Sequence, residues 1–340
     1  IAVGETVKVF YTITVEDDQG ATATDAVVIT INGTNDGPTI VAGSTDSAAA
    51  VTEDDATTLS DTGSIAFDDA DFTDTHTTQV SADQSNTLGG SLQITEVSQD
   101  AESTSGTASW KYEVASSATQ YLAEGETVTE SFTVTLVDDG NSATTSQVVT
   151  ATVTGVNDAP TIESITDAVT IAEDATDPKL SATGSVSFED VDLIDTHLVS
   201  VSADGANTLS GALTVSSVNQ SSTTSAGSFV WTYEVDNANV QYLAYGESVT
   251  ESFDITIEDP QGGTATDTVV ITIDGQNDAP VINATAQNLE GDITEGSTLS
   301  VTGSINFEDV DATDQPTASK ALVAGSIVGT KADGTTALSL

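Results

Sequence analysis

The sequence contains no cysteine and no methionine, and only 5 of its 340 residues are lysine or arginine. Without cysteine, disulfide bonds and thiolate metal sites are excluded, so a small domain must be stabilised by packing or by oxygen-ligated metal. Because there is no methionine to serve as initiator, we expect an internal or processed part of a longer protein. No run approaches 18 consecutive apolar residues and no signal-peptide pattern appears, so we expect no membrane insertion.

The few basic residues stand against 54 aspartates and glutamates, which gives a formal net charge of −49. Nucleic acids and anionic membranes are bound through lysine and arginine, so this charge excludes both as partners. It favours the binding of cations instead. High acidity with only 5% aromatic residues is also typical of disordered chains, so the deciding observation is whether the apolar residues are periodic.

The chain repeats itself with a period of about 120 residues. The string Asn-Asp-Gly-Pro at 35–38 returns as Asn-Asp-Ala-Pro at 157–160 and again at 277–280. A period of this length corresponds to a whole domain and not to one unit of a solenoid. The predicted organisation is the C-terminal part of a copy at 1–36, complete copies at 37–158 and 159–278, and the N-terminal part of a divergent copy at 279–340.

Apolar residues alternate with polar ones, which is the periodicity of β-strands. Val7, Val9, Tyr11, Ile13 and Val15 form one such set, and the corresponding positions of the next copies repeat it. Turn sequences rich in Gly, Asn and Asp separate the sets. The predicted fold class is therefore all-β: tandem antiparallel β-sandwiches of immunoglobulin type, each with roughly seven or more strands, in an extended array.

The two tryptophans, Trp110 and Trp231, allow two interpretations. An exposed indole could stack on a carbohydrate, but each tryptophan alternates with a tyrosine, Tyr112 or Tyr233, along a predicted strand. This alternation favours a place in the core.

A set of short motifs recurs in fixed order. They are Asn-Asp-Ala-Pro at 157–160, Ala-Glu-Asp at 172–174, Phe-Glu-Asp-Val-Asp at 188–192, Asp-Thr-His at 195–197, Tyr-Leu-Ala-Tyr-Gly-Glu at 242–247 and Glu-Asp-Pro-Gln-Gly at 258–262. With these motifs the chain resembles the VCBS repeat, a cadherin-like module that occurs in tandem in large bacterial surface adhesins of the RTX type. The resemblance implies an extracellular location, secreted or on the bacterial cell surface.

The resemblance to cadherins implies Ca²⁺ between successive domains, since cadherin junctions collect acidic ligands from two domains. We call the three junctions I, II and III, centred on Asn35-Asp36, Asn157-Asp158 and Asn277-Asp278. The ligands implied are Glu5, Asn35, Asp36, Asp69, Asp71 and Asp138 at junction I; Glu53, Glu126, Asn157, Asp158, Asp190, Asp192 and Asp259 at junction II; and Glu173, Glu247, Asn277, Asp278, Asp309 and Asp311 at junction III.

The chain departs from the cadherin pattern in two places. The turn reads Leu-Ala-x-Gly-Glu, which has one acid fewer, and the linkers carry Gly33, Gly155 and Gly275 where the first linker aspartate would fall. The last linker asparagine is also replaced, by Gly37, Ala159 or Ala279. We therefore expect about one or two ions per junction.

Other roles remain open for these residues. Any single acid could be a solvated loop residue, and asparagine and aspartate also close Asx-turns. Turn chemistry explains Asn157 and Asp158 but not the distant Asp190 and Asp192. The two histidines of the chain, in the Asp-Thr-His motif, have no visible third partner for acid–base or transition-metal chemistry, so a structural role is favoured.

We expect no enzyme, because a catalytic site is unique whereas these acids repeat, although counting carboxylates does not exclude glycoside hydrolysis. The predicted function is a stalk of a cell-adhesion protein, stiffened by Ca²⁺, that carries a distal binding domain for a cell-surface or glycan target. Its partners would be neighbouring repeats of the same chain. The alternatives are glycan- or peptide-binding modules, or a filament in which 1–36 and 279–340 of like molecules complete each other.

Overall fold

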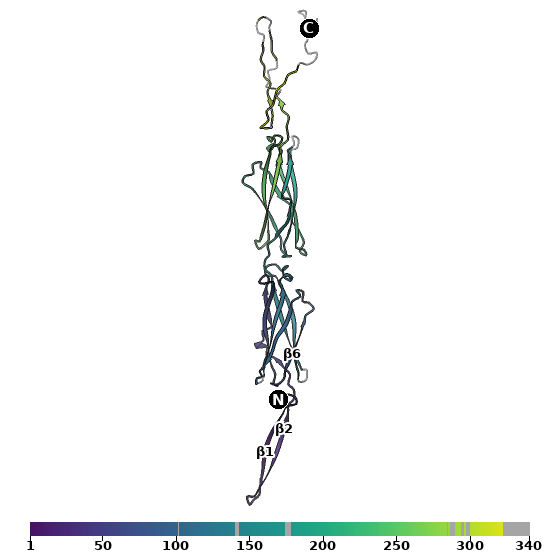
Figure 1. The fold of residues 1–340 in the computed structure, drawn as a ribbon, viewed down its shortest axis with the longest axis vertical. Helices are drawn as coiled ribbons and strands as arrows, with labels where there is room; N and C mark the ends of the chain where they lie inside the picture. The colour runs from purple at the N-terminus through teal and green to yellow at the C-terminus, as the bar shows by residue number, and fades with distance from the viewer. Residues whose placement is uncertain are drawn as a thin grey trace.

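The computed structural model describes residues 1–100, 102–139, 143–173, 178–283, 285, 290–293, 296 and 300–321. In this part of the chain a β-hairpin, two β-sandwiches and a short strand pair follow one another along one long axis (Figure 1). The helices found there are 3-10 turns, η1 (Ala42–Ser44), η2 (Ser116–Ala118) and η3 (Asn237–Asn239). Across these same residues, no helix has the length and apolarity that a bilayer crossing requires.

The first sandwich consists of strands β3 to β10, which form two four-stranded sheets with the orders β3-β5-β8-β7 and β4-β10-β9-β6. The strands of the first sheet are β3 (Thr39–Ile40), β5 (Thr58–Asp68), β8 (Ser105–Ala115) and β7 (Ser91–Gln99). Those of the second are β4 (Ala48–Thr52), β10 (Thr144–Thr154), β9 (Thr127–Asp138) and β6 (His76–Ala82).

The second sandwich, β11 to β19, repeats this topology with the sheet orders β11-β13-β17-β15 and β12-β19-β18-β14. The first sheet contains β11 (Thr161–Ile165), β13 (Lys179–Glu189), β17 (Ala226–Asp236) and β15 (Ala212–Val215), and β16 (Asn219–Gln220) also pairs with β17. The second contains β12 (Ala168–Ala172), β19 (Thr264–Asp274), β18 (Ser248–Glu258) and β14 (Leu198–Ala203).

The all-β prediction is confirmed, but the expectation of purely antiparallel sheets is wrong at one place in each sandwich. β4 pairs parallel with β10, and β12 pairs parallel with β19. The reason is topological. In an end-to-end array the chain enters a sandwich at one end and leaves it at the other, so the second strand (β4 or β12) and the last strand (β10 or β19) run the same way and are parallel where they meet.

The part-copies at the two ends of the chain form partial versions of this fold. β1 (Thr6–Glu16) and β2 (Thr22–Asn32) pair with Val7 opposite Ile31, which is the register of Val249 opposite Ile273 in the second sandwich. Ile31 is 50% exposed on the hairpin, whereas Ile273 is fully buried. In the final part-copy, β20 (Val281–Ile282) pairs with β21 (Phe307–Glu308).

The core of each sandwich contains the predicted alternating residues. Trp110 and Tyr112 are 1% and 0% exposed, and Trp231 and Tyr233 are both 0% exposed, so the placement of both tryptophans in the core is confirmed. The indole of Trp231 lies directly over Gly184 on the neighbouring strand, where an added Cβ would be only 2.4 Å from the ring. A glycine therefore recurs at this position because the indole occupies the space of a side chain.

A buried glutamate anchors a loop to the core of each sandwich. In the second, Glu251 is fully buried and accepts hydrogen bonds from the Tyr233 hydroxyl at 2.7 Å and from the backbone N–H of Leu209 at 2.8 Å and of Gly211 at 3.2 Å. Glu130 makes the matching contacts in the first sandwich. Three donors offset the cost of burying the carboxylate, and the loop before β15 is held in place.

The close contact between Trp231 and Gly184 predicts that adding one methyl group at Gly184 lowers the stability of the second sandwich. We expect Gly184→Ala to destabilise the second sandwich by about 1–3 kcal/mol, since the new Cβ would displace a fully buried indole. Gly205→Ala is the matched control, because nothing lies within 4 Å of a Cβ at that position. Urea unfolding followed by tryptophan fluorescence measures both, and equal stabilities of the two variants would contradict this packing.

Candidate functional site: acidic junctions between the sandwiches

The predicted acidic residues come together because they lie beside strand termini or in the short linkers and loops that follow them. Glu53 directly follows β4, Asp190 follows β13 and Asp259 follows β18. A strand that ends at a junction delivers its next side chain to the end of the sandwich, beside the linker to the neighbouring one. The sandwich architecture thus concentrates negative charge at the junctions.

At junction II, the part contributed by the first sandwich is centred on Glu53, which is 1% exposed. Its Oε2 accepts the linker N–H of Val156 at 3.2 Å, and its Oε1 accepts the side-chain amide of Gln120 at 3.1 Å. Burial raises the pKa of Glu53, and the neighbouring Asp158 and Asp54 raise it further. Glu53 thereby connects the body of the first sandwich to the linker.

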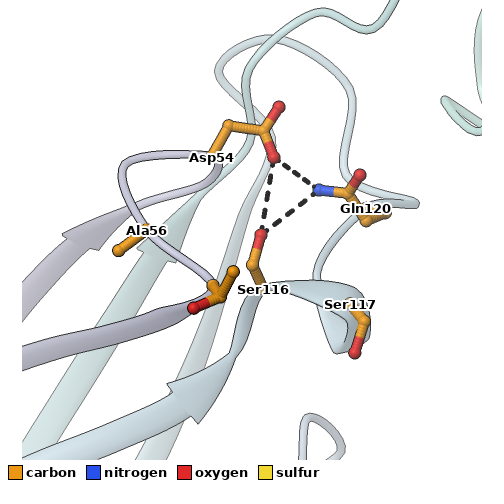
Figure 2. Close-up of a pocket in the computed structure, with 6 residues that line it drawn as sticks. Asp54, Ala56, Ser116, Ser117 and Gln120 are labelled. Atoms are coloured by element: carbon orange, nitrogen blue, oxygen red, sulfur yellow. Dashed lines mark hydrogen bonds between the residues drawn. The ribbon is translucent and has the colours of Figure 1, made fainter.

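Gln120 also lines a shallow depression at this end of the first sandwich, next to Ser116 and Asp54 (Figure 2). Its Nε2 donates to Asp54 Oδ1 at 2.8 Å. In the second sandwich Gln241 donates in the same way to Glu173, the predicted ligand at junction III. This glutamine was not among the predicted ligands, although a glutamine recurs directly before the Tyr-Leu-Ala motif.

The part of junction II contributed by the second sandwich is a loop that folds around the linker. The backbone N–H of Asp158 donates to Asp192 Oδ2 at 2.9 Å, and that of Asp192 donates to Asp190 Oδ1 at 2.9 Å. Asn157 donates through its side chain to Asp259 Oδ2 at 3.1 Å. Asp190, Asp192 and Asp259 are 1%, 0% and 4% exposed. The structure therefore brings these predicted residues together around the linker.

The carboxylates at junction II perturb one another. The pKa of Asp192 is raised to about 7, first by burial and then by Asp190, Asp158 and Asp195. The pKa of Asp158 is raised by burial and by Asp54 and Asp190. When no cation is bound, burial and the neighbouring acids thus disfavour the ionised carboxylates of Asp192 and Asp158.

Asp195 is a member of this group that the sequence analysis missed as a ligand. It is 8% exposed, and one of its carboxylate oxygens lies within 4.8 Å of oxygens of Asp190 and Asp259. Burial, Asp190 and Asp259 raise its pKa. The sequence did contain a pattern that could have identified Asp195 as a ligand, because an aspartate recurs at this position in every copy, as Asp74, Asp195 and Asp314.

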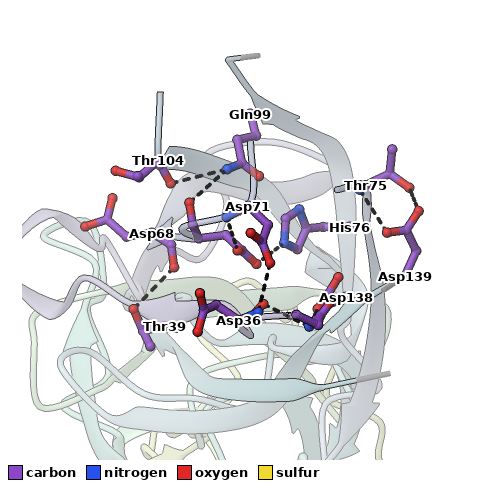
Figure 3. Close-up of polar contacts among 12 residues, drawn as sticks. Asp36, Thr39, Asp68, Asp71, Thr75, His76, Gln99, Thr104, Asp138 and Asp139 are labelled. Carbon is purple, nitrogen blue, oxygen red and sulfur yellow. Dashed lines mark hydrogen bonds and ion pairs between the residues drawn. The ribbon is translucent and has the colours of Figure 1, made fainter. Parts of the chain in front are cut away.

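Junction I repeats the arrangement (Figure 3). Asp36 N–H donates to Asp71 Oδ2 at 2.8 Å, and Asp71 N–H donates to Asp69 Oδ1 at 2.9 Å. Asn35 donates to Asp138 Oδ2 at 2.6 Å. Asp74, the counterpart of Asp195, has a pKa raised to about 6 by burial and by its acidic neighbours, Asp138 first.

Junction III shows the same linker contact with less burial. Asp278 N–H donates to Asp311 Oδ2 at 2.9 Å, and Glu173 Oε2 accepts Gln276 N–H at 3.1 Å. Asp311 is 3% exposed, but Asp309 is only half-buried and Asn277 is exposed. The side-chain amide of Asn277, a predicted ligand, donates to the backbone carbonyl of the neighbouring linker residue Asp278.

The glutamates that end these turns, Ile-Ala-x-Gly-Glu at junction I and Leu-Ala-x-Gly-Glu at junctions II and III, share one backbone contact. Glu5, Glu126 and Glu247 each accept the backbone N–H three residues earlier, at 3.0, 3.3 and 3.1 Å. Glu5 and Glu247 also accept a threonine hydroxyl of the next copy, from Thr73 at 3.4 Å and Thr313 at 3.1 Å. At junction II the corresponding residue is the isoleucine at 194, which has no hydroxyl to donate, and among the described residues the Glu126 carboxylate accepts its hydrogen bond from Ala123 of its own turn.

These junctions fit a hard divalent cation. Ca²⁺ binds oxygens at 2.3–2.6 Å, so ligand oxygens of one ion lie within about 5 Å of one another. The oxygens of Asp190, Asp195 and Asp259 meet this requirement. Asn157 Oδ1, Asp158 Oδ2, Asp192 Oδ1 and Asp195 Oδ2 are buried without a hydrogen-bond donor. Buried polar atoms are normally partnered, so these oxygens fit the inner surface of a cation site.

Comparisons with known proteins add the following. No family profile and no curated protein matches the chain. Among solved structures it is similar to PcdhgB3 EC1-4, with 15% identity, 91% of this chain and 67% of that chain covered, and a TM-score of 0.40. For the protocadherin gammaB7 EC3-6 cis-dimer the identity is 16%, the coverage 83% and 62%, and the TM-score 0.41. For the zebrafish RET cadherin-like domains 1 to 4 the identity is 12%, the coverage 80% and 58%, and the TM-score 0.25.

These similarities are distant, and the tandem sandwich fold follows from the strand registers described above. None of these comparisons names a bacterial adhesin or a VCBS repeat, and that resemblance stays a prediction.

The raised pKa of Asp192 predicts how stability depends on pH without calcium. The pKa rises from about 3.9 in the unfolded chain to about 7 in the folded one. The stability contributed by the protonated carboxyl is therefore present below about pH 4 and is lost as pH rises through about 7. In calcium-free buffer, Asp192→Asn should gain stability relative to the wild type as pH increases from 5 to 8. Thermal unfolding at both pH values measures this, and a difference independent of pH would contradict it.

Proposed function

We propose that this chain is part of an extracellular stalk in which Ca²⁺ at the junctions makes a row of cadherin-like sandwiches stiff. The stalk holds a distal binding domain away from the bacterial cell surface, as the resemblance to adhesin repeats implies. The complete modules would be 37–158 and 159–278. The absence of a catalytic site stays a prediction.

The contacts around Asp158 are the observation that carries the proposal. Asp158 lies in the linker, its backbone donates to Asp192 of the second sandwich, and its carboxylate is electrostatically coupled to Glu53 of the first. An ion bound among these groups would contact both sandwiches at once. Since like charges repel when no cation is present, the ion-bound form is the one that favours a fixed linker.

Calcium would act by mass action. An ion that binds the ordered junction and not the open one stabilises the ordered form by about 2.7 kcal/mol when its concentration is 100 times the dissociation constant. Extracellular modules commonly bind calcium with dissociation constants of about 10⁻⁴–10⁻³ M. At about 1 mM calcium, each such site would stabilise the ordered form by about 0.4–1.4 kcal/mol. The chain would thus be stiff where calcium is plentiful.

A glycan-binding module is the second candidate, and exposed tyrosines are the observation that favours it. Tyr242 and Tyr245, in the loop after η3, are 43% and 79% exposed. In the first sandwich, however, Tyr121 is 36% exposed and the position of Tyr245 is occupied by Glu124. The pair of exposed tyrosines is therefore found in the second sandwich and not in the first. Because a glycan-binding repeat would be expected to keep the pair in both copies, we favour the stalk.

Removing calcium tests the proposal. In calcium the chain should show a long maximum dimension in small-angle X-ray scattering, and this dimension should shorten in calcium-free buffer because the linkers bend. The melting temperature should fall as well. An unchanged dimension and an unchanged melting temperature would contradict the junction clamp.

Asp192→Asn should lower the calcium affinity of junction II by about tenfold or more, because one carboxylate ligand becomes a neutral amide. In calcium-free buffer the variant should be at least as stable as the wild type, since a buried charge is removed. Glu96→Gln, an exposed position on β7, removes one negative charge away from the junctions and is the matched control. Calorimetric titration with calcium measures the affinities, and equal affinities of the two variants would exclude Asp192 as a ligand.

A further inference from the structure

We propose that His197, and His76 at the equivalent position, are positioning residues that hold one carboxylate of the junction site in a fixed orientation. His197 Nε2 lies 2.8 Å from Asp190 Oδ2, and His76 Nε2 lies 3.0 Å from Asp69 Oδ2. All four side chains are at most 1% exposed. The sequence showed no partner for these histidines; in the structure the partner is a predicted metal ligand.

The histidine and the loop backbone together restrain both oxygens of Asp190. Oδ1 accepts the N–H of Asp192 at 2.9 Å, while Oδ2 faces His197. The imidazole ring is itself fixed, because it packs against Phe188 at a centroid distance of 4.8 Å and its Nδ1 lies 2.6 Å from Gln220 Oε1. Asp190 therefore has little freedom to rotate.

The restrained carboxylate belongs to a group that still has unsatisfied oxygens. Asp195 Oδ2 and Asp192 Oδ1 are buried without a hydrogen-bond donor, on residues 8% and 0% exposed. Oxygens of Asp190, Asp195 and Asp259 lie within 4.8 Å of one another. An outer group that orients a metal ligand raises affinity, and its loss typically costs 10–100-fold. The histidine thus has a role toward a divalent cation that packing alone does not require.

The third copy departs from the other two at this position. There Pro316 takes the place of the histidine, and its side chain has no hydrogen-bond donor. Asp309, the counterpart of Asp190, therefore has no histidine at the equivalent position to restrain it.

The inference rests on the proposed calcium clamp, and it is tested with double variants so that junctions I and II change together. His76→Phe/His197→Phe removes the donors and keeps a ring of similar size. His76→Gln/His197→Gln keeps an amide nitrogen near the position of Nε2. We expect the phenylalanine variant to bind calcium 10–100-fold more weakly than the wild type in calorimetric titration, and the glutamine variant to recover most of the affinity.

Melting temperatures in calcium-free buffer separate positioning from packing. If the histidines position a ligand, the phenylalanine variant should lose more stability in calcium than in calcium-free buffer, where only the buried hydrogen bond is lost. Unchanged calcium affinity in this variant would overturn the inference. A loss of stability of equal size with and without calcium would also overturn it, since the histidines would then only support the fold.

If the phenylalanine variant does not fold, His76→Asn/His197→Asn replaces it, because the shorter amide cannot reach the carboxylate. Affinity that is low with asparagine and restored with glutamine supports the inference, and equal affinity of these two variants overturns it. A wild-type chain that binds no calcium would contradict the proposed function instead, so the two failures are distinguishable.

Discussion

Repulsion among carboxylates that the fold itself brings together is the constraint on which the arrangement of this chain depends. The strands deliver Glu53, Asp190 and Asp259 to the ends of the sandwiches, and the linker residue Asp158 lies among them. Backbone N–H groups satisfy only some of the carboxylate oxygens, and others are buried without a donor. A divalent cation from the surrounding solution would satisfy the remaining oxygens, and this is the basis of the proposed calcium clamp.

The three junctions share a framework but are not equivalent. Each has a linker aspartate whose N–H donates to the second aspartate of the Asp-x-Asp loop, at 2.8, 2.9 and 2.9 Å. The additional contacts differ: Thr73 and Thr313 reach a glutamate of the preceding copy, whereas junction II has Ile194 at this position. Histidine is present beside Asp69 and Asp190 but not beside Asp309. The backbone part of the junction is therefore constant, and the side-chain part is where individual junctions can be tuned.

Much of the fold could be predicted because two-residue periodicity and a repeat of about 120 residues both leave direct traces in the sequence. The core position of Trp231 followed from its alternation with Tyr233. The parallel pairing of β12 with β19 could not be predicted, since it depends on where the chain crosses between sheets and not on any local pattern. At the site, the motifs identified acids that do converge, such as Asp190, Asp192 and Asp259. Asp195 and Gln120 were missed, because their roles arise from contacts with residues distant in the sequence.

The parallel ladders have a consequence for how the chain responds to a pulling force. β4 lies near the start of the first sandwich and β10 near its end, and five consecutive residue pairs join them, from Thr150 opposite Ala48 to Thr154 opposite Thr52. When the two ends of a sandwich are pulled apart, these two strands are drawn past each other lengthwise. The hydrogen bonds between them are then loaded in shear and share the load, instead of opening one after another as in a peeled hairpin. A tether made of such units resists extension at each link.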